Sequence, residues 1–308
     1  MKKLVSTLNL PKEEWLKYRK QGIGGSDAGA ICGLNPYRSA IQVYYDKTTE
    51  DIEDIDNEAM RQGREMEDYV ARRFMEETGK KVRRANAMFY NEENKFMLAD
   101  VDRMVVGENA GLECKTTSPF MAEYWSGDKI PLSYQMQCYH YMSVCNADAW
   151  YVAVLIYGKE FKVYKLERDE EIIANMIRLE KNFWENNVLK RILPEPDGSK
   201  LADSVIAEYY KESTGAVIPL HGFDDKLKRR EELVELINKI ETEKRLIEQE
   251  LKMYLGDAEK AENQLFRVSW KEVVSSRFDT KALQEQEPDV YKKYLKQTSS
   301  RRFMVKSA

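Results

Sequence analysis

Residues 97–117 hold the feature that most constrains how this chain can fold. Two short apolar runs, 97–106 and 112–116, are joined by the Gly- and Asn-containing segment 107–111. This pattern predicts a β-hairpin with its turn at 107–111. Because side chains alternate between the two faces of a strand, Glu113 and Lys115 are expected to point the same way.

The predicted hairpin also carries a second acid. Asp102 lies on the first strand, while Leu112 and Cys114 point away from Glu113 on the second. Carboxylate oxygens suit Mg²⁺, which usually takes one or two carboxylates together with waters and phosphate oxygens. Two acids beside a lysine ammonium therefore predict a hard-cation site of the kind that cleaves phosphodiesters.

Composition disfavours several other function classes. The chain has 308 residues, enough for one large domain or two modest ones, and only two histidines, His140 and His221. So few imidazoles argue against a zinc hydrolase with several His ligands and against a Ser-His-Asp triad, unless His140 serves. Acid–base chemistry must then come from carboxylates, Lys, Tyr or a metal.

The sequence predicts a cytoplasmic protein. Its four cysteines form no C-x-x-C pair, which is typical of a reduced compartment, and we expect no disulfides. We find no apolar run of about 18 residues, and no signal-peptide pattern at the N-terminus. With a net charge of −4, nucleic acid binding would need a local basic lining; 80–84 and 301–302 are candidates, or simply solvated surface.

A glycine-rich turn precedes a short predicted helix at residues 22–37. Ser26 and Asp27 follow three glycines and can cap a helix that runs through Ile31 and stops near Gly33. The free N–H groups at such a helix start can bind an anion. An ordinary capped turn explains the pattern equally well, and no Walker motif follows.

Helices and strands alternate over the first 190 or so residues, which predicts a layered α/β domain. Glu67 lies at the border of the apolar face of one helix, where it either leans toward a site or points to solvent, and Gln137 and Tyr141 share a face of another. The expected helices are 12–21, 57–78, 131–147 and 169–191, and the expected strands are 82–90, 96–106, 112–116, 149–157 and 160–166.

A turn-rich break at 193–199 predicts two parts, 1–195 and 196–308. Residues 224–255 form a long charged helix with apolar residues at a/d spacing, whose seam needs a helix from this chain or from a neighbour. A strand-like run at 265–275 and a helix around 280–297 follow.

Five phrases in order resemble the PD-(D/E)XK nuclease superfamily and, within it, the YqaJ-like phage exonucleases related to lambda exonuclease. The phrases are WLKYRKQGIGGSDAGAICGLNPY, GREMEDYVARRF, LADVDRMV, LECKT and SYQMQCYHYM, and the tail 278–306 also looks like longer YqaJ-type proteins. The resemblance implies an α/β restriction-endonuclease-like core, a central mixed sheet flanked by helices, with a C-terminal long-helix extension. Val101-Asp102 replaces the usual Pro-Asp, but the aspartate is kept.

The resemblance also implies a role for each matched residue. Asp102, Glu113 and the Cys114 carbonyl would bind Mg²⁺, and Glu67 would complete a second metal position; Mn²⁺ can substitute. Lys115 would position and polarise the attacking water. Gln137 would support this group from its helix, with Tyr141 as a weaker assignment, and Arg19 and Ser26 would hold a DNA 5′-phosphate.

The function implied is a Mg²⁺-dependent 5′→3′ exonuclease of phage or prophage recombination. It would act on double-stranded DNA ends, release mononucleotides and leave 3′ tails for a single-strand annealing protein, as a ring-shaped homo-oligomer without membrane contact. Two alternatives stay open: an endonuclease or helicase-associated nuclease of the same superfamily, and a non-catalytic DNA-binding or recombinase-loading subunit. An iron–sulfur relative is disfavoured because Cys114 and Cys138 fall inside predicted elements.

Overall fold

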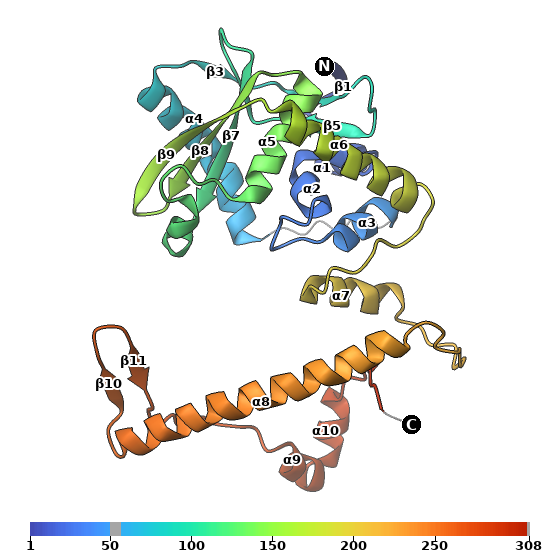
Figure 1. The fold of residues 1–308 in the computed structure, drawn as a ribbon, viewed down its shortest axis with the longest axis vertical. Helices are drawn as coiled ribbons and strands as arrows, with labels where there is room; N and C mark the ends of the chain where they lie inside the picture. Colours follow the sequence, from blue (N-terminus) through green and yellow to red (C-terminus); the bar gives the residue numbers. More distant parts are fainter. Residues whose placement is uncertain (50–56, 307–308) are drawn as a thin grey trace. The chain divides into compact units, whose positions relative to one another are not determined.

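A computed structural model describes residues 1–49 and 57–306 (Figure 1). The chain divides into two units, Met1–Tyr210 and Lys211–Ala308. Each unit is described by itself.

A five-stranded mixed sheet forms the middle of the first unit. Its strands, in spatial order, are β3 (Val82–Arg83), β6 (Arg103–Val105), β7 (Ala110–Thr117), β8 (Ala149–Ile156) and β9 (Glu160–Glu167). β7 and β8 are parallel, and the other neighbouring pairs are antiparallel. The predicted strands at 149–157 and 160–166 and their hairpin pairing are confirmed.

Helices cover both faces of this sheet. Alternate residues of β8 point in opposite directions: Trp150 and Val152 pack in the cluster that contains α5 (Leu132–Cys145), and Tyr151 packs in the cluster that contains α4 (Glu58–Thr78). A strand buried on both faces needs an almost continuous apolar sequence, as β8 has. The expected mixed sheet flanked by helices is confirmed.

A second sheet has the order β1–β4–β5–β2, with its strands at Lys2–Ser6, Ala87–Tyr90, Met97–Asp100 and Ile23–Gly24. The two long strands predicted at 82–90 and 96–106 are wrong, because each is divided between the two sheets. Asn86 has a positive φ of 50°, which ends β3 before β4 begins. At the second break, the Asp102 carboxylate accepts a hydrogen bond from the Cys114 N–H instead of continuing the strand.

The predicted helices of the first unit are present. They are α1 (Lys12–Lys20), α4, α5 and α6 (Glu170–Phe183), the last continuing as a π-helical turn over Trp184–Val188. The short helix predicted after the glycine turn is α2 (Gly25–Ile31). A 3₁₀ helix at Pro119–Trp125 and two α-helices, α3 (Ala40–Thr48) and α7 (Lys200–Tyr209), were not predicted.

α7 belongs with the first unit, which therefore extends past residue 195, where the sequence placed the boundary. Its Tyr209 ring lies 6.4 Å from the Tyr44 ring of α3. This packing ties the segment after the turn-rich break to the first unit.

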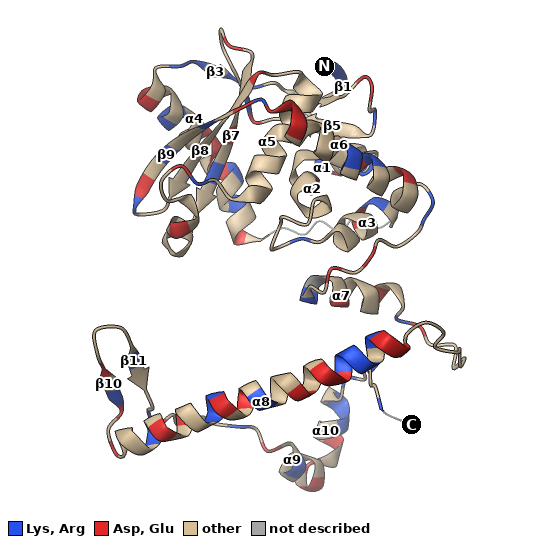
Figure 2. Cartoon of the chain, viewed as in Figure 1, with Lys and Arg blue, Asp and Glu red and all other residues tan. Residues whose placement is uncertain are grey.

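The second unit contains the expected long helix, α8 (Asp224–Leu255), which ends at Gly256. Lys and Arg alternate with Asp and Glu along it (Figure 2). Its a/d side chains, such as Ile237 and Ile240, stay 52% and 56% exposed, so the described residues do not cover the seam.

The rest of the second unit differs from expectation. A short hairpin of β10 (Lys260–Glu262) and β11 (Arg267–Ser269) replaces the long strand, and Pro288 begins α10 (Pro288–Tyr294) directly after α9 (Thr280–Gln286). The predicted single helix is therefore two. Across the described ranges, every helix is too short or too polar to cross a bilayer.

A buried ion pair holds α5 against α6 and the second sheet. His140 Nδ1 lies 2.8 Å from Glu180 Oε1, and Nε2 lies 2.9 Å from the Leu98 carbonyl oxygen. Burial alone would lower the pKa of His140, but the charge and hydrogen bond of Glu180 raise it above its ordinary value. Two oxygen acceptors around one ring suit the doubly protonated imidazolium.

Glu180→Gln should destabilise the first unit by about 3–5 kcal/mol, because it leaves a buried charge without its partner. Because the pKa of His140 is raised, the ion pair makes its full contribution to the free energy of unfolding below pH about 6.5. That contribution is lost as pH rises through the pKa of His140 in the folded state. Urea unfolding of the wild type between pH 5 and about 9 should give a free energy of unfolding that falls with rising pH, and the variant should show a smaller fall. Glu171→Gln, at an exposed position of α6, is the control; equal stability of both variants would contradict the account.

Candidate active site

Three predicted residues meet on the α5 face of β7. Lys115 Nζ lies 2.6 Å from Glu113 Oε1 and 3.2 Å from the Gln137 side-chain oxygen. The Gln137 amide donates to the same Glu113 oxygen at 2.7 Å. The alternation of side chains on β7 and the placement of Gln137 on α5 thus bring together residues from two separate sequence phrases.

Asp102 joins this group from the break between β5 and β6. Its Oδ2 accepts a 2.8 Å hydrogen bond from the Cys114 backbone N–H. Burial, followed by the charges of Glu113 and Glu67, raises the pKa of Asp102 well above its ordinary value. Burial is the main cause, and the smaller effects of Glu113 and Glu67 show that the three carboxylates lie close enough to interact. The backbone of Cys114, the other predicted ligand, lies beside Asp102.

Glu67 reaches this region from α4, and its side chain is 30% exposed. It accepts a hydrogen bond from Arg103, a guanidinium that is itself buried and also binds Asp68. The sequence left open whether Glu67 faces a site or solvent. It lies at the edge of an acidic cluster formed by Asp102, Glu113 and Glu67 itself, and it is paired with the Arg103 guanidinium.

The acidic cluster has the donor set for a divalent cation. Glu113 Oε2 is buried and, within the described part of the chain, lacks a hydrogen-bond partner. The described ranges contain no preformed group of three or more metal-ligating His, Cys, Asp or Glu side chains. Mg²⁺, however, usually takes only one or two carboxylates from a protein. Asp102 and the Glu113 oxygen that lacks a hydrogen-bond partner therefore suit such an ion as ligands, and Glu67 lies nearby.

Lys115 carries a positive charge in this group. Burial would lower its pKa, but Glu113 raises the pKa of Lys115 above its ordinary value. The ammonium also lies 4.6 Å from the centre of the Tyr134 ring. A permanently protonated lysine can orient and polarise a bound group, and it cannot act as a general base near neutral pH.

Close packing of α2 on α5 connects the acidic cluster to the glycine turn. A Cβ on Gly25 would lie 2.5 Å from Tyr141 Cε1 and 3.1 Å from Gln137 Cγ, and one on Gly29 would lie 2.9 Å from Ser133 Cα. Only residues without a side chain allow this approach. Tyr141, the weaker assignment, receives a 3.0 Å hydrogen bond from Gln137 at this contact.

The two residues predicted to bind phosphate are adjacent. Arg19 Nη2 donates to Ser26 Oγ at 3.2 Å, which joins the end of α1 to the first turn of α2. The Arg19 guanidinium also lies 4.8 Å from the centre of the Trp15 ring. The guanidinium and the hydroxyl at a helix start form a site that suits an anion.

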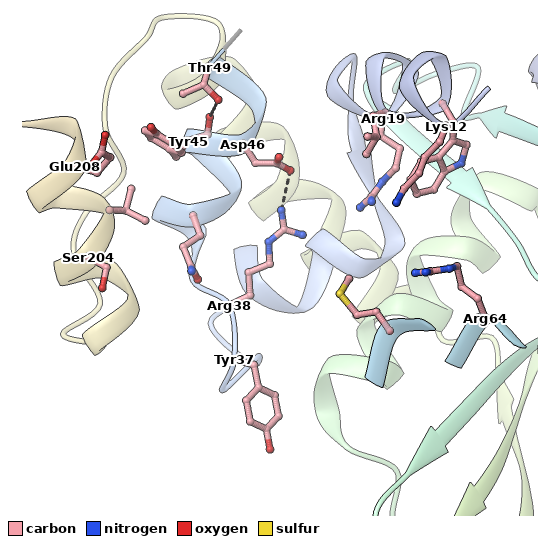
Figure 3. Close-up of a pocket in the computed structure, with 15 residues that line it drawn as sticks. Lys12, Arg19, Tyr37, Arg38, Tyr45, Asp46, Thr49, Arg64, Ser204 and Glu208 are labelled. Atoms are coloured by element: carbon pink, nitrogen blue, oxygen red, sulfur yellow. Dashed lines mark hydrogen bonds and ion pairs between the residues drawn. The ribbon is translucent and has the colours of Figure 1, made fainter. Parts of the chain in front are cut away.

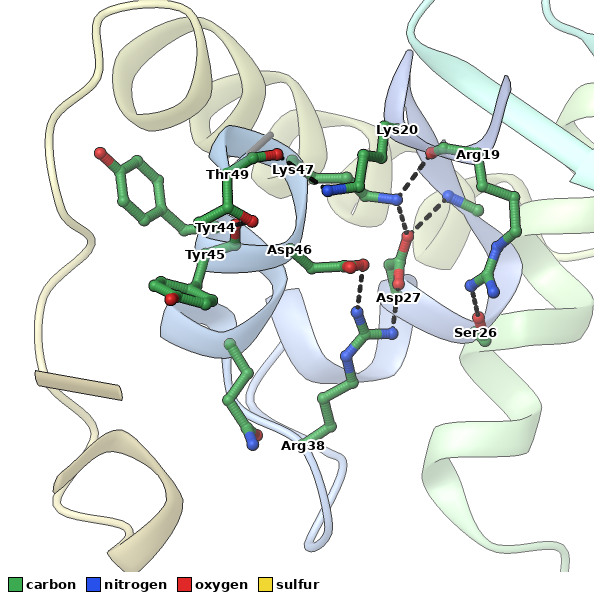
Figure 4. Close-up of polar contacts among 12 residues, drawn as sticks. Arg19, Lys20, Ser26, Asp27, Arg38, Tyr44, Tyr45, Asp46, Lys47 and Thr49 are labelled. Carbon is green, nitrogen blue, oxygen red and sulfur yellow. Dashed lines mark hydrogen bonds and ion pairs between the residues drawn. The ribbon is translucent and has the colours of Figure 1, made fainter. Parts of the chain in front are cut away.

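A buried ionic network holds this anion site in shape (Figure 4). Asp27, fully buried, binds Arg38 at 2.6 Å and Lys47 at 2.8 Å, and it accepts a hydrogen bond from the Gly24 N–H. Burial would raise the pKa of Asp27, but the charges of Lys47 and Arg38 hold it well below its ordinary value. Lys47 also donates to the Arg19 carbonyl at 2.8 Å. The network therefore holds both helices of the anion site, α1 with Arg19 and α2 with Ser26.

Sequence reasoning missed Arg103, Lys47 and Asp100. Asp100 receives a 2.5 Å hydrogen bond from the Trp15 indole, and thus links the anion site to β5. Lys47 had a detectable signal: it follows Val43 by four residues on the buried face of α3, and a lysine there needs an acidic partner. Arg103 had no comparable signal in the sequence, because an arginine directly after an acidic residue is a common surface pattern.

The basic segment 80–84 is partly neutralised by acids. Lys80 pairs with Glu108, and Arg84 pairs with Asp68 at 2.6 Å. Lys81 and Arg83 are exposed, so the segment stays a candidate nucleic-acid contact or solvated surface.

Gly25→Ala should destabilise the first unit by about 1–3 kcal/mol, because the new methyl group would overlap Tyr141. Gly63→Ala is the matched control, since its Cβ would meet its nearest neighbour, Thr116 Oγ1, at 3.9 Å. Alanine favours a helix interior, so this control should be neutral or stabilised by up to about 1 kcal/mol. Thermal unfolding of both variants measures the difference; equal stability would refute the tight α2–α5 contact.

The mixed sheet between helices, with Glu113-x-Lys115 on β7 and Asp102 at the break before β6, defines a PD-(D/E)XK nuclease-like core. Residues 14–148 match the YqaJ-like viral recombinase domain. "Uncharacterized protein YqaJ" from Bacillus subtilis (strain 168) is 38% identical over 308 residues, covering 98% of this chain and 97% of that protein. The chain therefore belongs to the YqaJ family.

Solved structures agree on the fold. An alkaline exonuclease, LHK-Exo, from Laribacter hongkongensis superposes with a TM-score of 0.52 at 19% identity, covering 59% of this chain and 94% of that one. LHK-Exo in complex with dAMP gives a TM-score of 0.51 at 20% identity, with the same coverage. At these identities the likeness concerns the fold.

Proposed function

We propose that this protein is a Mg²⁺-dependent 5′→3′ exonuclease that acts on the ends of double-stranded DNA. It would release 5′-mononucleotides and leave 3′ single-stranded tails. One observation carries the proposal: the acidic cluster around Glu113 and the anion site at Arg19 and Ser26 lie on either side of the α2–α5 contact. The names of the structural neighbours, an alkaline exonuclease and its complex with dAMP, support it.

The acidic cluster would hold the metal. Asp102 and Glu113 would be its protein ligands with the Cys114 carbonyl, and Glu67 would serve a second ion after exchanging its pairing with Arg103. When bound, Mg²⁺ supplies Lewis-acid activation of a water and stabilises charge on the phosphate, and Mn²⁺ can do the same.

The chain's own residues orient the reaction. Gln137, on α5, donates a hydrogen bond to Glu113, and Glu113 in turn fixes the position of the Lys115 ammonium. Lys115 would then position the attacking water and offset the negative charge that develops on the phosphate. Glu113 and Gln137 are buried, the Lys115 side chain is 19% exposed, and all three are hydrogen-bonded before substrate arrives, so little reorganisation is needed.

The anion site would give the reaction its direction. Arg19 and Ser26 would bind the 5′-phosphate, and this contact fixes the distance from the strand end to the scissile bond. A stop at one end of the site suits removal of one nucleotide at a time. An endonuclease that cuts within a duplex, away from any strand end, would have no use for such a stop.

The recombination role extends the proposal beyond the single chain. We propose that the 3′ tails are passed to a single-strand annealing protein in a bacterial cytoplasm, and that the enzyme acts as a ring-shaped homo-oligomer around DNA. A ring would keep the enzyme on DNA despite the net charge of −4. The mass of the protein in solution tests this part.

Lys115→Ala and Glu113→Gln should each lower nucleotide release by at least about 100- to 1000-fold, because each removes charge stabilisation that acts in the transition state. The assay follows acid-soluble nucleotide from linear duplex with Mg²⁺, with circular dichroism to show that the variants fold. Glu93→Gln, on an exposed loop, should retain full activity. A Lys115 variant that digests duplex at the wild-type rate would place the active site elsewhere.

Arg19→Ala should reduce the preference for 5′-phosphorylated over 5′-hydroxyl ends by roughly ten- to a hundredfold, the range expected for a lost hydrogen bond to a charged group. Lys17→Ala is the control, since Lys17 lies on the same helix and pairs with Glu13. Initial rates on the two kinds of end give the ratio. An unchanged ratio in the Arg19 variant would reject the pocket assignment.

A further inference from the structure

A cavity of about 1040 Å³ adjoins the anion site within the first unit. Its walls come from α1, α3, α7, the first turns of α4 and the segment before α3 (Figure 3). Arg19 belongs both to the cavity and to the pair with Ser26. Removal of a single terminal nucleotide requires no space beyond that pair, so the cavity needs another explanation.

The described lining of the cavity has more basic than acidic side chains. Among the described residues that line it, four are basic and two are acidic. Lys12, Arg19 and Arg64 gather at one side of the cavity in Figure 3, and Arg38 comes from another direction. Arg38 pairs with Asp46 at 2.9 Å and with the buried Asp27 at 2.6 Å, so the excess of positive charge comes from Lys12, Arg19 and Arg64. An excess of cations near a phosphate-binding arginine favours a ligand with further phosphates.

Aromatic side chains lie among these cations. Trp15, Tyr37 and Tyr45 line the same space, and Tyr37 is 67% exposed. Cations that follow a phosphate backbone, combined with aromatic faces for bases, are characteristic of sites for single-stranded nucleic acid. The volume resembles that of pockets for small ligands, about 300–1,000 Å³, which suits a few unpaired nucleotides and excludes a duplex.

We propose that this cavity binds the nucleotides of an unpaired 5′ strand that extends past the Arg19–Ser26 pair. The inference rests on the proposed function. Arg19 and Ser26 would then accept an internal phosphodiester as well as a terminal phosphate. Water would add to the scissile phosphorus and the P–O3′ bond would break, so a short oligonucleotide with a 3′-hydroxyl leaves and the duplex keeps a 5′-phosphate. The enzyme would thereby trim a 5′ overhang in one cut.

Product size tests the inference. Full-length protein and Mg²⁺ are mixed with duplexes labelled near the 5′ end, one blunt and one with a short thymidine 5′ overhang, and the first products are separated on a denaturing gel. The wild type should release an oligonucleotide from the overhang and mononucleotides from the blunt end.

Two helix-α1 variants provide the matched comparison. Lys12→Glu reverses a charge that lines the cavity, and Lys17→Glu makes the same change outside it. Lys12→Glu should lower the oligonucleotide yield about tenfold, while Lys17→Glu should match the wild type. Tyr45→Leu, which keeps the charge and removes an aromatic face, should lower the same yield without changing the blunt-end rate.

The outcomes separate the two proposals. Mononucleotides alone from the overhang, or equal yields from the Lys12 and Lys17 variants, would overturn the cavity assignment while blunt-end digestion upholds the exonuclease. Failure to digest either duplex would overturn both.

Discussion

The close contact of α2 with α5 is the constraint on which the rest of the first unit depends. Gly25 and Gly29 allow the two helices to approach until side chains of α5 lie directly over the α2 backbone. From Met136 to Cys145 every residue of α5 is buried, as expected for a helix surrounded by other elements. From α5, Gln137 contacts Glu113 of the acidic cluster, and His140 contacts Glu180 of α6. A shift of α5 would therefore disturb the acidic cluster, the His140–Glu180 ion pair and the anion site together.

Charge is distributed unevenly across that contact. On one side, among the described residues, the three acids Asp102, Glu113 and Glu67 lie with two cations, Lys115 and Arg103, and one Glu113 oxygen lacks a hydrogen-bond partner there. Burial makes this excess of negative charge costly, and a divalent cation would relieve it. On the other side, basic residues around Arg19 favour anions. Under the proposed function, a substrate phosphate chain would bind across both, with its scissile phosphate at the acidic side and its end among the cations.

Part of this arrangement was predictable from sequence. Period-two alternation placed Glu113 and Lys115 on one face, and helical spacing placed Gln137 and Tyr141 together; the structure bears out both. The pairing of Arg19 with Ser26 came from the family resemblance, and it too corresponds to a contact in the structure. A local pattern sufficed for the first two pairs.

Long-range contacts were not predictable in the same way. A run of apolar residues does not show that Val101 and Asp102 leave one sheet for another, because the cause is a hydrogen bond to Cys114 twelve residues later. The Asp27 network depends on Lys47, which tertiary packing brings to a buried acid. α7 was missed because it is held by a ring contact with α3 and lies beyond a turn-rich break.

The order in which label leaves a duplex tests the central claim most directly. One linear, 5′-phosphorylated duplex carries label at the 5′ end of a strand and a second carries it at the 3′ end, and both are digested with Mg²⁺ beside a closed circular duplex. The account predicts immediate release of the 5′ label as a mononucleotide, delayed release of the 3′ label, and an intact circle. Early release of the 3′ label, or cutting of the circle, would contradict it.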